Sequence, residues 1–251
     1  MLSIDLNCDV GEGCGNDAEL LKIVSSANIA CGYHAGDVDT MRRTADLAVE
    51  NGVAIGAHPG YPDRDNFGRV AMDLSGTRVK EIIMDQVSAL AEITKAAGGK
   101  LVHVKPHGAL YNQSARDPDL AGTIAEAVWS FDPKLTLFGL SGSCSILEAE
   151  RIGLRTASEV FADRTYQTDG SLTPRTAHDA LIHDRERASV QVLDMIKYGR
   201  VRSVDAIMIQ IVAETVCIHG DGENAVDVAR SIADALARNN IAIRSINGRE
   251  E

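Results

Sequence analysis

Residues 75–105 read SGTRVKEIIMDQVSALAEITKAAGGKLVHVK, and this stretch holds one complete helix-to-strand unit. Apolar side chains recur at helical spacing over Val79–Ile93, and the pair Gly98-Gly99 ends that pattern. A short apolar run, Leu101–Lys105, follows at once and has the length of a buried strand. The stretch therefore predicts an amphipathic helix that leads into a strand of a parallel sheet.

The same alternation continues along the whole chain. The predicted strands are Leu2–Asn7, Ala27–Ala30, Val53–Ala57, Leu101–Lys105, Leu135–Leu140, Arg155–Glu159, Ala206–Cys217 with a break inside it, and Ile241–Ile246. The predicted helices are Asp39–Asn51, Ser75–Ala97, Arg185–Tyr198 and Asn224–Asn239. No Pro/Ser/Gly-rich linker divides the 251 residues, so we expect one α/β domain over residues 1–251. The expected fold is a TIM-like barrel, which is either complete or irregular with one strand fewer. A doubly wound sheet is the alternative.

Composition excludes several classes of protein. The chain carries 25 basic and 36 acidic side chains, a net charge of −11, and has no basic run, so nucleic acid and anionic membrane surfaces are not expected partners. Its 5 cysteines form no CxxC pair, which favours a reducing compartment. We find no signal peptide and no apolar run long enough to span a membrane, and we expect a cytoplasmic protein.

Nucleotide-binding motifs are absent or poor. The glycines after the first strand, in VGEGCGND at 10–17, do not fit G-x-G-x-x-G because the third comes too early, and Glu12 would repel a pyrophosphate. No GxxxxGK[ST] string occurs. If the protein uses ATP, another chain must supply the phosphate cradle.

Polar residues crowd the predicted strand ends, where parallel α/β folds place their chemistry. Asp5, Asn7 and Asp9 alternate along the first strand and should share one face, with Glu12 just beyond. Three buried polar groups are costly unless they are paired or bind a ligand. The other strand-end candidates are Asn28, His34, Asp37, His58, His103, Lys105, His107, Glu159, Asp163, Arg164, His219 and Asp221, and Tyr166 follows Arg164 in the next loop.

These candidates suit proton transfer and anion binding. Histidine is the side chain that titrates near neutral pH, and five of the 7 histidines lie on or just beyond strands, although any one of them could be purely structural. Lys105 and Arg164 could bind an anion, and a lysine reaching the rim or a surface salt bridge are the alternatives. A divalent metal held by Asp9, His34 and His58, with His107 as a possible replacement, is a further hypothesis that spacing alone does not test.

Several long motifs resemble the LamB/YcsF family, in which the bacterial ATP-dependent 5-oxoprolinase has its A-type subunit. They are DLNCDVGE at 5–12, SANIACGYHAGD at 26–37, GAHPGYPD at 56–63, FGR at 67–69, VKPHGALYN at 104–112, EVFADRTY at 159–166, DGSLTPR at 169–175 and CIHGD at 217–221. The chain departs from the family pattern at Val70, where a second arginine is usual, and at 222–224, where a Pro-containing turn is usual.

The resemblance implies a barrel related to glycoside hydrolases and deacetylases. It also implies hydrolysis of the lactam of 5-oxoproline to glutamate, with ATP cleavage and two further subunits of B and C type. On this reading Asp9, Glu12, Lys105 and His107 are catalytic, with Asp9 or His107 as base and Lys105 stabilising the oxyanion. The expected substrate-binding residues are Asn7, Asn28, His34, His58, Arg69, Asp163, Arg164 and Tyr166, with Arg164 or Arg69 holding the carboxylate.

Two other classes of function stay open at this point. A metal-dependent deacetylase or amidohydrolase acting on a sugar or small amide would use the same barrel, with Asp9, His34 and His58 as ligands. A non-catalytic scaffold that shapes the partner chains is the third possibility. A requirement for metal would distinguish the deacetylase or amidohydrolase from the oxoprolinase. An active complex that tolerates substitutions at the strand ends of this chain would identify the scaffold.

Overall fold

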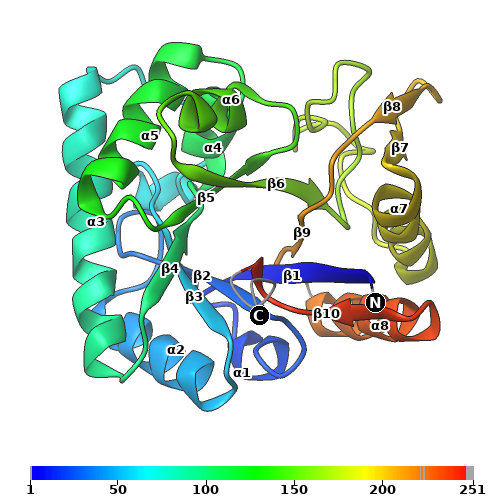
Figure 1. Ribbon diagram of the computed structural model, residues 1–251, viewed down its shortest axis with the longest axis horizontal. Helices are drawn as coiled ribbons and strands as arrows, with labels where there is room; N and C mark the ends of the chain where they lie inside the picture. Colours follow the sequence, from blue (N-terminus) through cyan, green and yellow to red (C-terminus); the bar gives the residue numbers. More distant parts are fainter. Residues whose placement is uncertain (1, 221, 223, 247–251) are drawn as a thin grey trace.

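The computed structural model describes residues 2–220, 222 and 224–246, and its centre is a closed ring of parallel strands (Figure 1). The ring consists of β1 (Leu2–Val10), β2 (Ser26–Ala30), β3 (Ala54–His58), β4 (Leu101–Val104), β5 (Thr136–Leu140), β6 (Arg155–Phe161) and β9 (Thr215–Ile218). Each strand pairs with the next in this order, and β9 also pairs with β1. The predicted barrel is confirmed in its seven-stranded form, and the doubly wound alternative is wrong.

Three further strands lie outside the ring. β10 (Ile241–Ile243), predicted as an eighth strand, pairs in the described part of the chain with the start of β1, from Leu2↔Ile241 to Ile4↔Ile243. The predicted strand 206–217 divides into β8 (Met208–Gln210) and β9. β8 pairs antiparallel with β7 (Arg200–Arg202), a hairpin that the apolar pattern did not predict.

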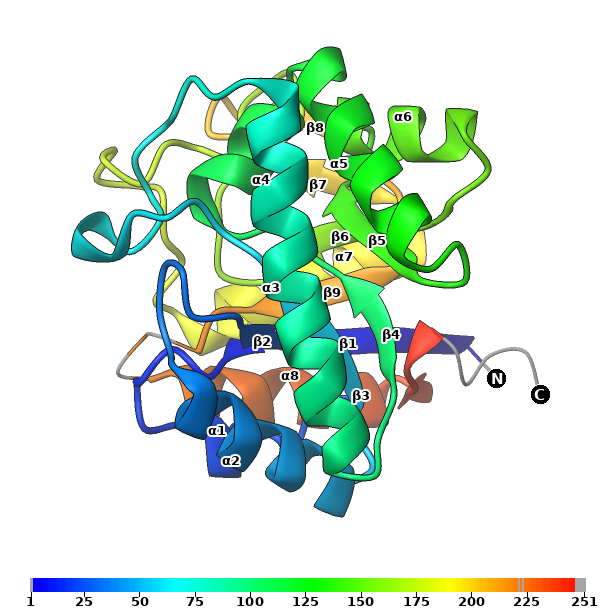
Figure 2. The ribbon, with the colours of Figure 1, turned by 90° about the vertical axis from the view of Figure 1, so that its left-hand side faces the viewer.

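Helices cover the outside of the ring, as the two views show (Figures 1 and 2). They are α1 (Asp17–Leu20), α2 (Val38–Glu50), α3 (Gly76–Ala96), α4 (Gly108–Ser114), α5 (Pro118–Phe131), α6 (Cys144–Arg151), α7 (Arg185–Tyr198) and α8 (Ala225–Arg238), with a 3-10 turn, η1, at Arg64–Asn66. The four predicted helices are α2, α3, α7 and α8. Asp37 caps α2 by accepting the Thr40 N–H at 2.7 Å, and Ser75 caps α3 in the same way.

Strand β1 separates the apolar layer from a polar barrel interior. Its even-numbered residues from Ile4 to Val10 are apolar and belong to the hydrophobic core. Its odd-numbered residues Asp5, Asn7 and Asp9 are also buried, and they bond to side chains from other strands of the ring. Bulky aliphatic residues usually fill the interior of such a barrel. Here the interior is a hydrogen-bonded polar core, which is accessible from outside at the carboxyl ends of the strands.

Gly56 makes room for one member of this polar core. A Cβ atom at position 56 would lie 2.0 Å from Nε2 of His103 on the neighbouring strand β4. His103 stacks on Phe138 of β5, with ring centroids 4.1 Å apart. The glycine on β3 therefore lets an imidazole cross the interior of the barrel.

None of the helices in the described part of the chain has both the length and the apolar character that a membrane crossing requires.

Candidate active site

A cavity of about 480 Å³ opens at the carboxyl ends of the ring strands, where this fold places active sites. Its lining is rich in charged and ring-bearing side chains: Asp9, Glu12, His58, Arg69, Lys105, His107, Tyr111, Arg116, Phe161, Arg164, Arg175 and His219. Seven of these residues were predicted from the sequence to be catalytic or to bind substrate: Asp9, Glu12, His58, Arg69, Lys105, His107 and Arg164. The cavity thus combines several cations with carboxylates and imidazoles.

Lys105 lies at the floor of the cavity between two carboxylates. Its ammonium is 2.8 Å from Oδ1 of Asp9 and 3.0 Å from Oε1 of Glu159, and it also donates to Sγ of Cys217 at 3.0 Å. All four side chains are buried. Burial alone would lower the pKa of Lys105, but Asp9, Cys217 and Glu159 raise it well above its usual value, so the lysine is charged.

Asp9 is held as a carboxylate. Burial by itself would raise its pKa, but His58 and Lys105 hold the pKa of Asp9 well below its usual range. Oδ1 accepts from Asn28 as well as from Lys105, while Oδ2 lies 3.5 Å from Nε2 of His58. A carboxylate so stabilised positions and polarises groups better than it removes protons.

Asn7 and Asn28 lie below the cavity, inside the barrel. The Asn7 amide donates to Glu159 at 2.9 Å and to Thr215 at 2.7 Å, and its oxygen accepts from Asn28 at 2.7 Å. Neither asparagine lines the cavity. The two residues thus orient Glu159 and Asp9 from beneath, and their predicted contacts with substrate remain predictions.

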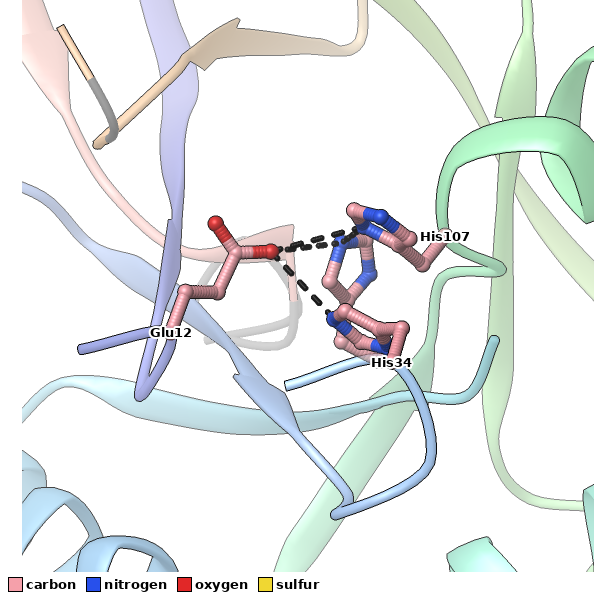
Figure 3. Close-up of side chains that lie close together, drawn as sticks. Glu12, His34 and His107 are labelled. Carbon is pink, nitrogen blue, oxygen red and sulfur yellow. Dashed lines mark hydrogen bonds and ion pairs between the residues drawn. The ribbon is translucent and has the colours of Figure 1, made fainter. Parts of the chain in front are cut away.

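Four residues that follow consecutive strands form a second group, which we call the histidine cluster. Its members are Glu12 after β1, His34 after β2, His58 at the end of β3 and His107 after β4. One ligand atom from each of the four lies within 4.8 Å of the other three. Figure 3 shows the Glu12 carboxylate directed towards the rings of His34 and His107, whose planes stack with centroids 3.7 Å apart.

Burial shapes the protonation of this cluster. Burial, with a contribution from the neighbouring His58, lowers the pKa of His34 to about 2. The same two causes hold the pKa of His107 well below its usual value. Both rings are therefore neutral at physiological pH and offer nitrogen lone pairs.

The predicted metal set and the observed group differ in their carboxylate. His34 and His58 belong to the histidine cluster together with His107, as the wider form of the hypothesis allowed. The cluster carboxylate is Glu12, whereas Asp9 bonds to Lys105 and Asn28. A three-glycine loop with positive φ at Gly11, Gly13 and Gly15 carries Glu12 back over the strand ends.

His219 and Asp163 form a dyad at the edge of the cavity. Nδ1 of His219 lies 2.8 and 2.9 Å from the two carboxylate oxygens of Asp163, so it carries the proton and donates it. The enclosed position of Asp163 would raise its pKa, but His219 lowers it below the usual value. A ring nitrogen of His219, an oxygen of Asp9 and Sγ of Cys217 lie within 4.8 Å of one another.

Arg164 and Tyr166 hold the segment that forms one wall. The Arg164 guanidinium donates to the carbonyls of Thr173 and Ala180, and burial lowers its pKa to about 10. The Tyr166 hydroxyl accepts the Phe161 N–H at 2.8 Å, and Tyr166 does not line the cavity. Their predicted contacts with substrate remain predictions, and Arg175 stands on the same wall.

The sequence pattern indicated no specific function for Glu159, Cys217, Arg175 or His219, although Glu159 ends one predicted strand and His219 follows another. All four lie in the motifs quoted above, at strand ends or in the wall segment, so position could have pointed to them. The pairing of His219 with Asp163, by contrast, is visible only in the folded structure.

Two residues at or just beyond the end of the last motif lie outside the described residues: Asp221, which closes CIHGD, and Glu223, in the turn that departs from the family pattern. Val70, where the family usually has arginine, is exposed and does not line the cavity.

Comparisons with known proteins support a family assignment. The chain is 41% identical to a lactam utilization protein from Thermus thermophilus, with a TM-score of 0.91 over 98% of this chain and 100% of that one. A peptidoglycan deacetylase from Bacillus subtilis (13% identity, TM-score 0.53, covering 99% and 90%) shares the fold. So does a family 4 carbohydrate esterase from Streptomyces lividans (13%, 0.50, covering 98% and 94%). The LamB/YcsF family model matches residues 4–251, and the chain belongs to this family.

Proposed function

We propose that this chain is the component of an ATP-dependent 5-oxoprolinase in which the lactam of 5-oxo-L-proline is hydrolysed to L-glutamate, acting with two further subunits. The observation that carries the proposal is the cavity over the buried Asp9–Lys105–Glu159 group, rimmed by arginines, in a chain of the LamB/YcsF family. The similarity to a lactam utilization protein supports the same substrate class.

The cavity suits a small anion. The substrate carries one carboxylate and one unreactive amide, and Arg69 and Arg175 on the lining offer guanidinium groups to the carboxylate. A volume of about 480 Å³ exceeds what a five-carbon lactam fills and leaves space for a phosphoryl group on its oxygen. The apolar edge of the ring would lie against Phe161.

The proposed chemistry proceeds in three balanced steps. ATP transfers its terminal phosphoryl group to the lactam oxygen, and ADP leaves. Water then adds to the ring carbon, the C–N bond breaks with a proton delivered to nitrogen, and a γ-glutamyl phosphate results. A second water hydrolyses this acyl phosphate to glutamate and phosphate.

The residues of the cavity supply distinct functions in the water steps. The Lys105 ammonium stabilises negative charge that develops on the substrate oxygen. His219, whose Nδ1–H is fixed by Asp163, presents Nε2 as the base that takes the proton of water. Asp9, with its low pKa, holds Lys105 in place, and Glu12 and His107 remain proposed catalytic residues at the opposite side of the cavity.

ATP binding is assigned to the complex rather than to this chain alone. The sequence has no Walker A string, and the N-terminal glycine loop carries Glu12 where a pyrophosphate would sit. We propose that the partner subunits hold the nucleotide and deliver its phosphoryl group at the mouth of the barrel.

Glutamate and phosphate release from 5-oxoproline and ATP tests this function. The chain alone should show no turnover, and the complex with its partners should release one glutamate per phosphate. Asp9→Asn and His107→Asn complexes should lose turnover while remaining assembled, and Arg155→Gln, an exposed change on β6, is the matched control. Full activity of both variants would contradict the site assignment, and would favour a scaffold function.

A metal-dependent amidohydrolase is the second candidate, and the histidine cluster favours it. The barrel fold shared with the deacetylases is consistent with it. This enzyme would release acetate from acetylated sugars or open small amides without ATP. Nucleotide-independent turnover that a chelator abolishes would establish it in place of the oxoprolinase.

A further inference from the structure

The tautomers of two cluster histidines can be read from their hydrogen bonds to the main chain. Nδ1 of His58 lies 2.7 Å from the carbonyl oxygen of Lys105, and Nε2 of His107 lies 2.8 Å from the carbonyl oxygen of Phe67. A carbonyl oxygen only accepts, so each of these ring nitrogens carries the hydrogen. The second ring nitrogens, Nε2 of His58 and Nδ1 of His107, are the atoms left to contact a ligand.

These two ring nitrogens lie 2.9 Å apart, a separation that either a shared proton or a metal ion bound to both would account for. Oε1 of Glu12 lies 3.4 Å from Nδ1 of His107 and 3.9 Å from Nε2 of His58. The same oxygen lies 3.3 Å from Nε2 of His34, whose Nδ1 is buried without a hydrogen-bond partner among the described residues.

We propose that the histidine cluster binds one divalent transition-metal ion of the zinc class, with Glu12 as the carboxylate ligand. Ligating histidines commonly donate their second ring N–H to a backbone carbonyl, and His58 and His107 both do so. Three imidazoles and one carboxylate form a donor set that suits Zn²⁺ and related ions.

Packing holds the rings in position before any ion arrives. A Cβ atom on Gly60 would lie 2.7 Å from Nδ1 of His34, and one on Gly68 would lie 2.8 Å from Cβ of His34 and 2.9 Å from Cδ2 of His107. These close approaches explain why glycine follows HP in the GAHPG motif and precedes arginine in FGR. Such preorganisation is what a binding site for a metal requires.

The ion would be reachable from the cavity. Glu12, His58 and His107 line the cavity, whereas His34 lies behind them. Catalytic metal sites keep a position open to water or substrate, and structural sites are closed. Four protein ligands would complete a tetrahedral ion, so water or substrate arriving from the cavity would enter as a fifth ligand. The proposed site does not depend on the proposed lactam chemistry, because its evidence is the geometry of the cluster alone.

Metal content and spectroscopy test the site without measuring turnover. Untagged protein purified from zinc-supplemented cells should contain about one equivalent of transition metal per chain, as inductively coupled plasma mass spectrometry measures it. After removal by a chelator, added Co²⁺ should produce a visible d–d absorption and raise the melting temperature. His107→Gln and Glu12→Gln should weaken Co²⁺ binding at least about 10- to 100-fold.

His103→Gln is the matched control, since His103 is buried in the same barrel but bonds to Asn28 and not to the cluster. It should bind Co²⁺ as the parent does. Circular dichroism of each apoprotein verifies folding, and Glu12→Gln, on a loop, keeps the test valid if His107→Gln fails to fold. The proposal is wrong if the parent binds no stoichiometric metal, or if the cluster variants and His103→Gln bind Co²⁺ equally.

Discussion

The ammonium of Lys105 lies 2.8 Å from Oδ1 of Asp9, and both side chains are buried inside the ring of strands. Removal of one member of such a pair leaves an uncompensated buried charge. The pair joins the end of β4 to β1 across the barrel, so its integrity matters both to the fold and to the floor of the cavity.

Lys105→Met should therefore destabilise the protein strongly. We expect the free energy of unfolding to fall by about 3–5 kcal/mol, measured by urea denaturation. The double variant Lys105→Met/Asp9→Asn removes opposite charges together and should recover part of that loss. A drop of less than about 1 kcal/mol in the single variant would mean that the pair is solvated.

Protonation of His103 should lower the free energy of unfolding as the pH falls. Burial, with a contribution from Lys105, lowers the pKa of His103 to about 3, against about 6.5 for an unfolded histidine. Between these pH values the unfolded chain binds a proton that the folded chain does not. The stability that the neutral His103 contributes is therefore complete above about pH 6.5 and declines as pH falls. The free energy of unfolding should change by about 1.4 kcal/mol per pH unit in this range. Unfolding curves at several pH values should show a shallower slope for His103→Gln and no change for exposed His183→Gln.

Gly56→Ala should destabilise the barrel by steric conflict. The added Cβ would lie 2.0 Å from Nε2 of His103, and overpacking of this kind costs about 1–3 kcal/mol. Gly122→Ala is the control, because a Cβ there comes no closer than 3.8 Å to another side chain and alanine favours the helix α5. Melting temperatures of the two variants should move in opposite directions, and a stable Gly56→Ala protein would require His103 to have moved.

If the proposed 5-oxoprolinase complex is reconstituted, the His219–Asp163 dyad predicts a specific kinetic result. His219→Gln should lower kcat by roughly 10²- to 10⁴-fold with little change in KM, because it removes a base and not a binding group. Asp163→Asn keeps the shape but loses the carboxylate that fixes the Nδ1–H tautomer, so it should lower kcat and alter the pH profile. Unchanged kcat in both variants would assign proton transfer to another residue.

Local patterns were sufficient to predict most of the barrel. The alternation of β1 indicated that Asp5, Asn7 and Asp9 share a face, and the spacing over 79–93 indicated the helix α3. The Asp117–Pro118 pair, an N-cap followed by proline at the start of α5, was a further signal that could have predicted that helix. Rules of this kind succeed for a helix or strand whose sequence pattern depends only on residues within that element.

Other features depend on contacts between distant residues. An apolar strand such as β10 carries no mark of its partner, so its position outside the ring could not be predicted from Ile241–Ile243. The choice of Glu12 over Asp9 in the histidine cluster depends on the path of a glycine loop that returns over the strand ends. The pairing of His219 with Asp163 joins residues from the ends of β9 and β6, which only the closed ring brings together.

The placement of β1 between β2, β9 and β10 has a consequence for synthesis of the protein. β1 is synthesised before all of its partners and can pair early with β2, but its other edge cannot pair until residues 215–218 and 241–243 have been made. Contacts of such long sequence separation form late and slow folding. The strand that carries Asp9 therefore gains its last neighbours more than 200 residues after its own synthesis, so nascent or truncated chains expose an unpaired edge that favours aggregation or chaperone binding.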